Sequence, residues 1–454
     1  MKNLPAPLIH DLQGIKGFDE ASFIAAHKHG PVTSVRINKA KDIALFTVNE
    51  KVPWCNDGVY LNERPVFTLD PAYHAGAYYV QEASSMFLAH LFKNCVGDRT
   101  GLRVLDLCAA PGGKSTLIAS LLDKESLLIS NDVIRARATI LEENMTRWGY
   151  MNSWVTSNDP RDFGRLHGYF DVVVVDAPCS GSGLFRKDAR ALDEWSENNV
   201  QLCGERQQRI LADVWPSLKE DGILIYATCS YSPQEDEEIL DWLEENHAIV
   251  SLDIPINEEW GIVKVLSPKG MAGYRFFPGK VKGEGFFIAA IQKKENAETL
   301  KYARFKTAHD KKIQEQAGYL LNNEDVCVIK TDNEHFSAIR PGHEPDIQLL
   351  QKTVYFRKTG LLLGSPTAKD WLPAHDVALS IDANENLSGI NLNREQALHF
   401  LKREDIGGLE QIEKGWLVVR YNGLGLGWVK SLGNRINNYL PKHWRIRMDI
   451  TDYD

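Results

Sequence analysis

The sequence predicts an α/β protein whose central region, residues 96–293, forms a largely parallel sheet with helices on both faces. Two observations support this fold class. Short apolar runs alternate with amphipathic stretches of helical length, which is the order of a strand–helix–strand fold. Several runs are also apolar without interruption, as Val172–Val175 shows, and such strands are typical of a parallel sheet that is buried on both sides.

The expected elements of this region follow one another in regular order. Strands are predicted at Arg103–Leu107, Leu127–Ser130, Trp154–Thr156, Asp171–Val175, Ile223–Ala227 and Phe286–Ile291, and helices at Gly113–Leu122, Arg135–Trp148, Glu197–Leu218 and Ser232–Glu245. In the last helix, Ser232 is the expected N-cap, with Pro233 at the first position and Glu235 completing a capping box. The acidic run Glu235–Glu238 is therefore interpreted as a solvated helix start and not as a metal site.

The regions on either side are shorter and mixed in pattern. Residues 1–95 predict a small α+β domain, with strands at Thr33–Ile37 and Leu45–Val48 and a helix at Glu82–Phe92. Residues 294–324 are polar and charged and are interpreted as a linker or an exposed helix. Residues 325–454 predict a small α+β or β-rich module with a Gly-Leu-Gly-Leu-Gly turn.

Composition limits the classes of function. The 454 residues are 43% hydrophobic and 25% charged, which excludes a disordered or collagen-like chain. The net charge of −9 has the wrong sign for a uniformly basic nucleic-acid binder, so any RNA contact must come from a local patch. Seven dispersed cysteines without a Cys-x-x-Cys pair argue against a zinc cluster, and no metal is expected. No run reaches the roughly 18 apolar residues of a membrane span, so we expect a cytoplasmic protein, and a monomer.

The sharpest local motif is RVLDLCAAPGGKS, at the end of the first predicted strand of the central region. It is not a phosphate-binding P-loop, because Cys108 stands where that motif needs glycine. Small residues in the turn allow a ligand to approach the backbone and the start of the following helix. Asp132 ends the next strand, where a carboxylate binds ribose hydroxyls, and Asp159 follows the third, where it can accept from an adenine amino group. This layout favours S-adenosylmethionine over a dinucleotide; the alternative is that both aspartates are only loop caps.

Two cysteines follow neighbouring strands at the same edge of the sheet. Cys179 lies in VVVVDAPCSGSG and Cys229 in ILIYATCSYSP. A thiolate that adds to carbon 6 of a pyrimidine makes carbon 5 nucleophilic, and an acid such as Asp176 can stabilise the adduct at ring nitrogen 3. A second thiol can assist release, and Lys114 or a helix start is a candidate cause of a lowered thiol pKa. The alternative is that each cysteine is a small buried hydrophobic residue.

These motifs together resemble the Sun-type RNA cytosine-carbon-5 methyltransferases, and most closely the bacterial F-type branch that modifies small-subunit ribosomal RNA. The resemblance extends over nearly the whole chain. It includes TSVRIN (33–38) and YYVQEASSM (78–86) near the start and RFFPGKVKGEGFF (275–287) at the end of the central region. PAHDVAL (373–379), GLGLGWVK and NNYLPKHWRIR resemble the C-terminal PUA-like module of that branch.

The resemblance implies a Rossmann-like S-adenosylmethionine-dependent methyltransferase with a role for each site residue. Cys229, in the Thr-Cys motif, is implied as the nucleophile, Cys179 as the residue that assists product release, and Asp176 with Lys114 as further catalytic residues. Implied cofactor contacts are Cys108, Ala109, Ala110, Pro111, Gly112, Gly113, Lys114, Asp132, Asp159 and Asp176. Two positions depart from the family pattern: Asp132 replaces a common glutamate, and Gly279 stands where histidine is frequent.

An RNA-binding surface is expected between Lys414 and Arg447. Seven basic residues occur there without any Asp or Glu, and aromatic residues are interleaved with them. Basic groups contact phosphates and aromatic faces stack on bases, although about half of these aromatics are expected in the module's own core. The expected partner is ribosomal RNA, with transfer RNA as the alternative, and the small ribosomal subunit is a further candidate. Two other functions are weighed: an amino-group methyltransferase, disfavoured by DAPC at 176–179, and a non-enzymatic RNA assembly factor.

Overall fold

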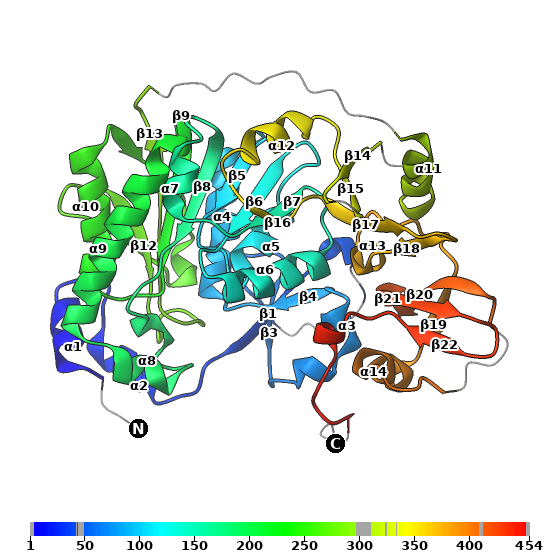
Figure 1. Ribbon diagram of the computed structural model, residues 1–454. Helices are drawn as coiled ribbons and strands as arrows, with labels where there is room; N and C mark the ends of the chain where they lie inside the picture. The colour runs from blue at the N-terminus through cyan, green and yellow to red at the C-terminus, as the bar shows by residue number, and fades with distance from the viewer. Residues whose placement is uncertain are drawn as a thin grey trace.

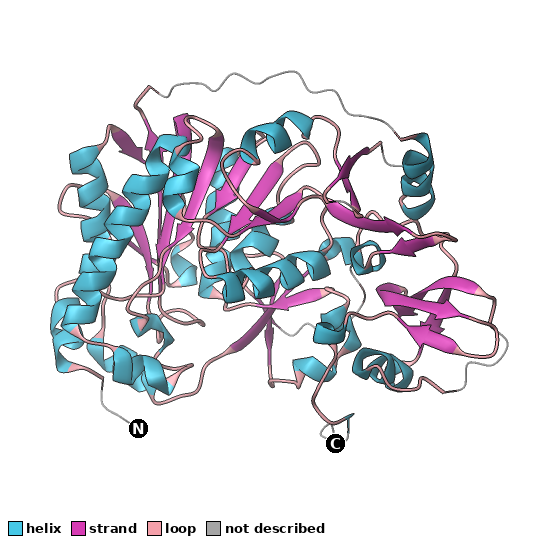
Figure 2. Ribbon diagram, viewed as in Figure 1, coloured by secondary structure: helices cyan, strands magenta, loops and turns pink. Residues whose placement is uncertain are grey.

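The structure is a computed structural model that describes residues 4–41, 43, 50–296, 310–322, 325–332, 334–407 and 412–450. The predicted strand Leu45–Val48 and linker residues 297–309 and 323–324 lie outside the described residues. The described residues form three regions in order along the chain: a small N-terminal region with one sheet, a central region with the large sheet, and a C-terminal region with two small sheets (Figures 1 and 2).

The central region is built on a ten-stranded sheet, in which nine strands follow the order β11-β12-β13-β9-β8-β5-β6-β7-β16 and β10 pairs with β13. Neighbouring strands from β9 to β7 are parallel, whereas β10–β13 and β16 are added in antiparallel pairs. The strands are β5 (Arg103–Asp106), β6 (Leu127–Asn131), β7 (Ser153–Thr156), β8 (Phe170–Asp176), β9 (Leu218–Thr228), β10 (Ile249–Ser251), β11 (Val263–Leu266), β12 (Ala272–Phe276), β13 (Phe286–Lys293) and β16 (Phe356–Lys358). This order confirms the predicted Rossmann-like sheet, in which β5 is central and the carboxyl ends of the parallel strands share one edge.

Helices cover both faces of this sheet, and each face has its own hydrophobic core. One face is covered by α7 (Pro160–Gly164), α9 (Glu197–Val214), α10 (Glu237–Asn246) and α12 (Glu344–Leu350), and the other by α4 (Leu88–Val96), α5 (Gly113–Ala119) and α6 (Arg135–Trp148). A short helix, α8 (Ala189–Glu194), follows the loop after β8. The apolar strands are therefore buried on both sides, as their uninterrupted hydrophobic sequence indicates.

The start of α10 differs from the prediction. A single 3-10 turn at Pro233–Glu235 comes first, and the α-helix begins at Glu237. The Ser232 side chain makes no capping hydrogen bond, so the predicted capping box is wrong. Strands β11 and β12 were not predicted, because Lys264 and Arg275 interrupt their apolar residues, and Arg275 is buried through ion pairs that come from elsewhere in the chain.

The N-terminal region packs beside the central sheet. It contains α1 (Ala6–Leu12), α2 (Glu20–His27), α3 (Pro71–His74) and a sheet in the order β2-β3-β1-β4, whose strands are β1 (Thr33–Ile37), β2 (Glu50–Lys51), β3 (Gly58–Leu61) and β4 (Tyr78–Val80). The predicted helix Glu82–Phe92 is displaced: a 3-10 turn covers Ser84–Phe87 and α4 follows. Both α1 and α2 contribute buried residues to the core of the central region.

Two four-stranded sheets form the C-terminal region. The first has the order β14-β15-β17-β18 and the second the order β19-β20-β21-β22. The elements are α11 (Lys311–Leu320), β14 (Cys327–Lys330), β15 (Phe336–Ile339), β17 (Leu361–Pro366), β18 (Trp371–Pro373), α13 (His375–Leu379), β19 (Gly389–Leu392), α14 (Arg394–Lys402), β20 (Gly415–Tyr421), β21 (Leu424–Ser431) and β22 (Ile436–Asn438). In addition, β16 extends the central sheet by pairing with β7, so residues after 325 also pack on the central region.

The predicted Gly-Leu-Gly-Leu-Gly turn is mostly strand. Only Gly423 lies in the turn, at φ +82°, and Leu424–Gly427 belong to β21 and pair with β20. A Cβ on Gly425 would come within 1.8 Å of the Ala378 carbonyl oxygen, so this glycine permits α13 to pack closely on the strand. In the described part of the chain, no helix is long and apolar enough to cross a membrane.

Candidate functional site

The carboxyl ends of β5, β6 and β7 are joined by one buried amide side chain, Asn131. Its Nδ2 donates to the carbonyl oxygens of Leu107 (3.1 Å) and Asn158 (3.0 Å). Its Oδ1 accepts from Thr156 Oγ1 and from the Asn158 backbone N–H, both at 2.9 Å. Sequence reasoning missed this residue, although it directly precedes Asp132. These bonds hold the three loops that surround a cavity at this edge of the sheet.

The cavity has a volume of about 470 Å³. Three of the predicted cofactor residues line it, Cys108, Asp132 and Asp159, whereas Ala109–Lys114 and Asp176 do not. Other lining residues were not predicted and come mainly from the loop after β6 and from α9: Val133, Ile134, Arg137, Pro160, Pro178, Arg206, Arg209, Ile210 and Asp213. The residues of α9 could not be predicted from motifs at strand ends, because this helix lines the cavity only through tertiary packing.

Asp132 has a free hydrogen-bonding position in this cavity. Its Oδ1 accepts from the Ile134 N–H at 2.9 Å. Its Oδ2 is buried and has no hydrogen bond, although the Arg137 guanidinium forms an ion pair with it at 3.3 Å. Next to it, the apolar side chains of Val133 and Ile134 line the same cavity and are more than half exposed. A carboxylate beside apolar side chains fits a ribose attached to a flat base.

Asp159 is both a cap and a lining residue. Its side chain accepts from the Arg161 N–H and caps α7, and it is 43% exposed. Asp106, at the end of β5, was not predicted as a site residue. It is fully buried, accepts from Ser115 Oγ at 2.6 Å, and its other carboxyl oxygen has no partner. Burial raises the pKa of Asp106 to about 7, and the hydrogen bond from Ser115 opposes this shift.

The turn after β5 carries Lys114 at the start of α5. Its ammonium forms an ion pair with Asp176 at 2.7 Å and, among the described residues, makes no hydrogen bond to the Cys179 or Cys229 thiol. Burial acts to lower the pKa of Lys114, but the charge of Asp176 outweighs it and the pKa is raised. The predicted pair of catalytic residues is thus a direct contact, and Lys114 is held in its charged form. Burial also raises the pKa of the Cys108 thiol.

The two predicted cysteines are in contact. Cys179 Sγ lies 3.0 Å from Cys229 Sγ, and neither cysteine is in a disulfide. The hydrogen bond with Cys229, together with burial, raises the pKa of Cys179 well above its ordinary value. Pro178, which directly precedes Cys179, lines the 470 Å³ cavity, so the loop that carries this cysteine borders the cavity. The topology therefore brings together the four catalytic residues that the sequence predicted.

A buried carboxylate, Glu235, connects the two cysteine loops. It accepts from the Ser180 N–H (2.7 Å) and Ser180 Oγ (2.5 Å), and from Ser230 Oγ (2.6 Å). Gln207 Nε2 of α9 adds a fourth bond at 3.2 Å. Ser180 and Ser230 directly follow the two cysteines in sequence. Burial raises the pKa of Glu235, and the hydrogen bonds from these serines counteract that shift.

The acidic run is therefore not a solvated helix start, and that interpretation is wrong. Glu235, Asp236 and Glu237 are all buried, and only Glu238 is exposed. Arg275 of β12 forms ion pairs with Asp236 (3.1 Å) and Glu237 (2.5 Å). Asp236 in turn accepts from Thr228 Oγ1 at 2.6 Å, which fixes the residue before Cys229. The distant partner Arg275 is the reason why a local reading of this run failed.

Gly279 adopts φ +95°, and a Cβ there would come within 2.8 Å of the Ser22 carbonyl oxygen of α2. The histidine that is frequent at this position would require α2 to move. Glycine at position 279, in place of histidine, therefore allows α2 to pack closely against the loop that follows β12.

The expected basic surface at 414–447 is partly occupied by contacts within the protein. Lys430 forms an ion pair with Asp370 at 2.8 Å, and Arg420 donates to the Leu387 carbonyl oxygen at 3.0 Å. Trp428 is buried and Trp416 donates to Asp370, so these rings belong to the module. The exposed basic residues of the stretch are Lys414, Arg435, Lys442, Arg445 and Arg447.

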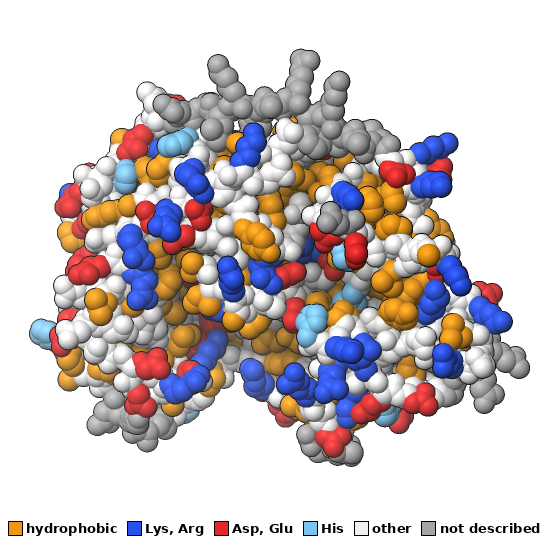
Figure 3. All heavy atoms as spheres, viewed as in Figure 1, with side chains coloured by type: hydrophobic (Ala, Val, Ile, Leu, Met, Phe, Trp, Pro, Cys, Tyr) orange, Lys and Arg blue, Asp and Glu red, His pale blue; other side chains and the backbone are white. Residues whose placement is uncertain are grey.

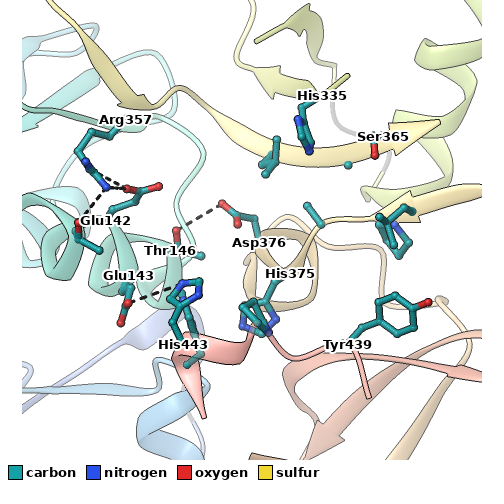
Figure 4. A pocket seen from close by; sticks show the side chains of 18 residues that line it. Glu142, Glu143, Thr146, His335, Arg357, Ser365, His375, Asp376, Tyr439 and His443 are labelled. Atoms are coloured by element: carbon teal, nitrogen blue, oxygen red, sulfur yellow. Dashed lines mark hydrogen bonds and ion pairs between the residues drawn. The ribbon is translucent and has the colours of Figure 1, made fainter. Parts of the chain in front are cut away.

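A second cavity, of about 450 Å³, lies where this module meets α6 (Figure 4). Its carboxylates already have partners. Glu142 pairs with Arg357 at 2.9 Å, Asp376 accepts from Thr146, and Glu143 lies 4.0 Å from His443. His375 is buried beside the Trp444 ring, and burial lowers the pKa of His375 to about 4. None of the predicted site residues lines this cavity.

Comparisons with known proteins agree with this arrangement. Residues 96–292 match the family described as 16S rRNA methyltransferase RsmB/F, residues 388–446 the methyltransferase RsmF PUA domain, and residues 4–83 the N-terminal domain of 16S rRNA methyltransferase RsmF. A protein of Shewanella piezotolerans called ribosomal RNA small subunit methyltransferase F is 30% identical over 90% of this chain and 89% of its own length. Its counterpart in Psychromonas ingrahamii is 30% identical over 97% of this chain and 96% of its own length.

Among solved structures, a methyltransferase homolog from Pyrococcus horikoshii superimposes with a TM-score of 0.52 at 27% identity. It covers 64% of this chain and all of its own. The match supports the Rossmann-like sheet, and the cavity, with an unbonded Asp132 oxygen at a strand end, fits S-adenosylmethionine. The family match extends from the N-terminal region to the PUA domain, as the resemblance predicted. The chain belongs to the RsmF family of S-adenosylmethionine-dependent methyltransferases.

Proposed function

We propose that this protein transfers the methyl group of S-adenosylmethionine to carbon 5 of a cytosine in small-subunit ribosomal RNA. The observation that carries the proposal is the 3.0 Å contact between Cys179 and Cys229 beside the Lys114–Asp176 ion pair. A methyltransferase that acts on an amino group needs no thiol, whereas carbon 5 of cytosine needs covalent activation. Ribosomal RNA is proposed because the curated relatives over most of the chain are called small-subunit ribosomal RNA methyltransferases.

Asp132 and the apolar residues beside it are the proposed cofactor contacts. The unbonded Asp132 oxygen accepts from a ribose hydroxyl, and Val133 and Ile134 cover the face of the adenine. Asp159, which lines the same cavity, accepts from the adenine amino group while it caps α7. The turn Cys108–Gly113 and Lys114 are assigned to the methionine end, since they follow β5 at the same edge. Bound S-adenosylmethionine supplies an electrophilic methyl group.

The four catalytic residues then act on the cytosine in sequence. The Cys229 thiolate adds to carbon 6, and the electron pair of the carbon 5–carbon 6 double bond makes carbon 5 nucleophilic. Asp176 enters this step protonated and gives its proton to ring nitrogen 3 of the adduct, and Lys114 then pairs with the carboxylate that remains. After methylation, Cys179 passes its own proton to solvent and, as a thiolate, takes the proton from carbon 5; the carbon 5–carbon 6 double bond re-forms, and Cys229 leaves as the thiolate. Before the attack, the raised pKa keeps Cys179 as a thiol that donates to the Cys229 thiolate, and once this hydrogen bond is lost the deprotonated Cys179 is a strong base.

RNA helices do not expose this base, so the cytosine must be turned out of its stack to reach the cysteines. The exposed basic residues of the C-terminal module are proposed to hold the surrounding RNA. A basic patch on a chain of net charge −9 favours a positioned substrate over indiscriminate RNA binding.

Cysteine variants test this mechanism. We expect Cys229→Ala to abolish 5-methylcytosine formation, and Cys179→Ala to accumulate a covalent protein–RNA adduct on denaturing gels. Cys95→Ala, at a partly buried thiol of α4, is the matched control and keeps activity. Full activity of Cys229→Ala would exclude the mechanism, and N4-methylcytosine as the product would indicate an amino-group methyltransferase. Bisulfite sequencing of RNA from a deletion strain identifies the target and separates ribosomal from transfer RNA.

A further inference from the structure

A groove of about 570 Å³ lies between the N-terminal sheet and the loop that follows Cys179. Ser34 of β1, Gln81 and Glu82 after β4, and Arg64 after β3 form one side. Lys187, from the loop after β8, lies on the other. The space-filling view shows a hollow on this face, between the lobe of α1, α2 and α8 and the N-terminal sheet, with Lys and Arg side chains gathered on both sides (Figure 3).

The charge available in this groove is positive. Within the ranges that the structure describes, neither the Lys187 ammonium nor the Arg64 guanidinium has a carboxylate within ion-pair distance, and both residues are exposed. Arg64 lies over the Phe67 ring at 5.4 Å. The Glu82 carboxylate accepts from the backbone N–H groups of Ser84, Ser85 and Glu284 at 2.8–3.0 Å, so its oxygens are already hydrogen-bonded, and it is the one anion among the described residues of this lining against two cations.

The groove is tied to the cysteines by short contacts. Gly183, between Cys179 and Lys187, donates its N–H to the Cys229 carbonyl oxygen at 2.8 Å. Arg186 donates to the Gly30 (2.8 Å) and Gly283 (3.1 Å) carbonyl oxygens and fixes the end of the loop that carries Lys187. On the other side, a Cβ on Gly113 would lie 3.8 Å from Gln81 Cδ, next to Lys114. The groove therefore borders both the cysteine loop and the start of α5.

The cavity in Figure 4 provides a contrast. Three carboxylates line it, Glu142, Glu143 and Asp376, and its buried histidine is neutral because burial lowers its pKa. The Arg357 guanidinium in this cavity is already paired with Glu142 at 2.9 Å, so it is not free to bind an anionic backbone. Of the two, only the groove beside the cysteines combines uncompensated cations with a short path to the reacting thiols.

We propose that this groove binds the phosphates of the RNA strand that carries the target cytosine, with Lys187 and Arg64 each neutralising one phosphate. The inference rests on the proposed function, since it places the nucleotides on either side of the base that Cys229 attacks. Ser34 and Gln81 form the neutral floor of the groove, where the sugar of the extruded nucleotide passes. Lys187 is on the loop of Cys179, so phosphate binding also holds that loop at the substrate.

Salt dependence of RNA binding tests the inference, because each neutralised phosphate on a single strand contributes about 0.7 to the slope of log affinity against log salt. The probe is a fluorescently labelled single-stranded RNA that contains cytosine, titrated with the full-length protein. We expect Lys187→Ala combined with Arg64→Ala to lower this slope by about 1.4, and Lys187→Arg to leave it unchanged. The Michaelis constant for RNA should rise several-fold, with unchanged affinity for S-adenosylmethionine.

The matched control is Lys312→Ala with Lys330→Ala, which removes two exposed charges from α11 and β14. An equal loss of slope in both double variants would show a general charge effect and overturn the inference. If the slope is unchanged in the groove variant while the wild type still forms 5-methylcytosine, phosphate binding in the groove is refuted and the proposed function is not. A wild-type protein that forms no 5-methylcytosine would overturn the proposed function itself.

Discussion

Cys179 Sγ and Cys229 Sγ lie 3.0 Å apart, at the ends of two neighbouring strands, in a protein whose described cysteines are all free thiols. The contact is only about 1 Å longer than a disulfide bond. A small shift of either loop is therefore sufficient to bring the sulfurs to bonding distance.

We predict that diamide oxidises this pair to an intramolecular disulfide, in which each thiol loses its hydrogen to the oxidant. Methyltransferase activity should fall as the bond forms and return with dithiothreitol, because the nucleophile is consumed reversibly. Peptide mapping by mass spectrometry checks the linkage, and Cys95→Ala should oxidise like the wild type. Inactivated protein in which both thiols still react with iodoacetamide would contradict the prediction.

Glu235 is predicted to control the alignment of the two cysteine loops. Glu235→Gln keeps the size of the side chain but places an amide NH₂ where the carboxylate accepts from Ser180 and Ser230. A hydrogen bond to a charged group is worth about 1.5–3 kcal/mol, so we expect the single-turnover methylation rate to fall at least about 10-fold.

The exposed neighbour Glu238 supplies the control for this substitution, since Glu238→Gln changes the same charge on the same segment. Its methylation rate and melting temperature should match the wild type. Affinity for S-adenosylmethionine, measured by calorimetry, should be unchanged in both variants. A Glu235→Gln protein with wild-type rates of adduct formation and release would refute a role in alignment.

Much of the central fold could be predicted, because its strands are buried on both faces and are read directly from apolar runs. Helix α6 has the predicted bounds, Arg135–Trp148. Strands β11 and β12 could not be predicted, since Lys264 and Arg275 break the apolar pattern and Arg275 needs Asp236 and Glu237 as partners. A pattern along the chain contains no information about charges that neutralise each other across the sheet.

The candidate site shows the same limit. Residues at strand ends, such as Asp132 and Cys229, could be predicted because parallel strands end at one edge. Glu235 could not, because its partners Ser180 and Gln207 come from another loop and from α9. The groove beside Lys187 could not be predicted from the sequence either, since it forms between regions that are more than a hundred residues apart along the chain.

Asp132 and Asp159 are predicted to differ in their contribution to cofactor affinity. Asp132 is almost fully buried with an unbonded oxygen, so Asp132→Ala should weaken S-adenosylmethionine binding about 10- to 100-fold. Asp159 is 43% exposed, and Asp159→Asn keeps the cap of α7, so its loss should be smaller. Isothermal titration calorimetry measures both; equal losses would indicate that Asp132 does not hold the ribose.

Asp106 should make stability depend on pH. Its pKa is raised to about 7 in the folded protein, from 3.8 when unfolded, so the folded state binds the proton more tightly between these values. The stabilisation that protonated Asp106 contributes to the free energy of unfolding is complete below about pH 4. It is lost as the pH rises through 7, and the total loss is about 4 kcal/mol. Asp106→Asn cannot ionise, and urea denaturation of both proteins from pH 5 to 8 should show the wild type losing stability relative to it. Parallel curves for the two proteins would contradict the assignment.

Lys41 joins three regions of the chain through a single buried ammonium. It donates to the carbonyl oxygens of Ala75 (2.8 Å), Arg147 (2.6 Å) and Leu379 (2.5 Å), and these belong to the N-terminal, central and C-terminal regions. In the charged form all three ammonium hydrogens are therefore used, while burial lowers the pKa of Lys41 to about 7. Two of these acceptors lie outside the N-terminal region, so this side chain ties the N-terminal region to the central and C-terminal regions.

Lys41→Met retains the length of the side chain but leaves the three carbonyl oxygens without this donor. Each buried acceptor that loses its partner costs about 1–3 kcal/mol, so the free energy of unfolding should fall by roughly 3 kcal/mol or more. The loss should appear first as separation of the C-terminal region, detected as faster hydrogen exchange in α13 and at the end of α6. Lys39→Met is the control, because Lys39 is largely exposed and pairs with Asp57 at the surface. Uniform acceleration of exchange over all three regions would show that Lys41 supports global stability without holding this junction.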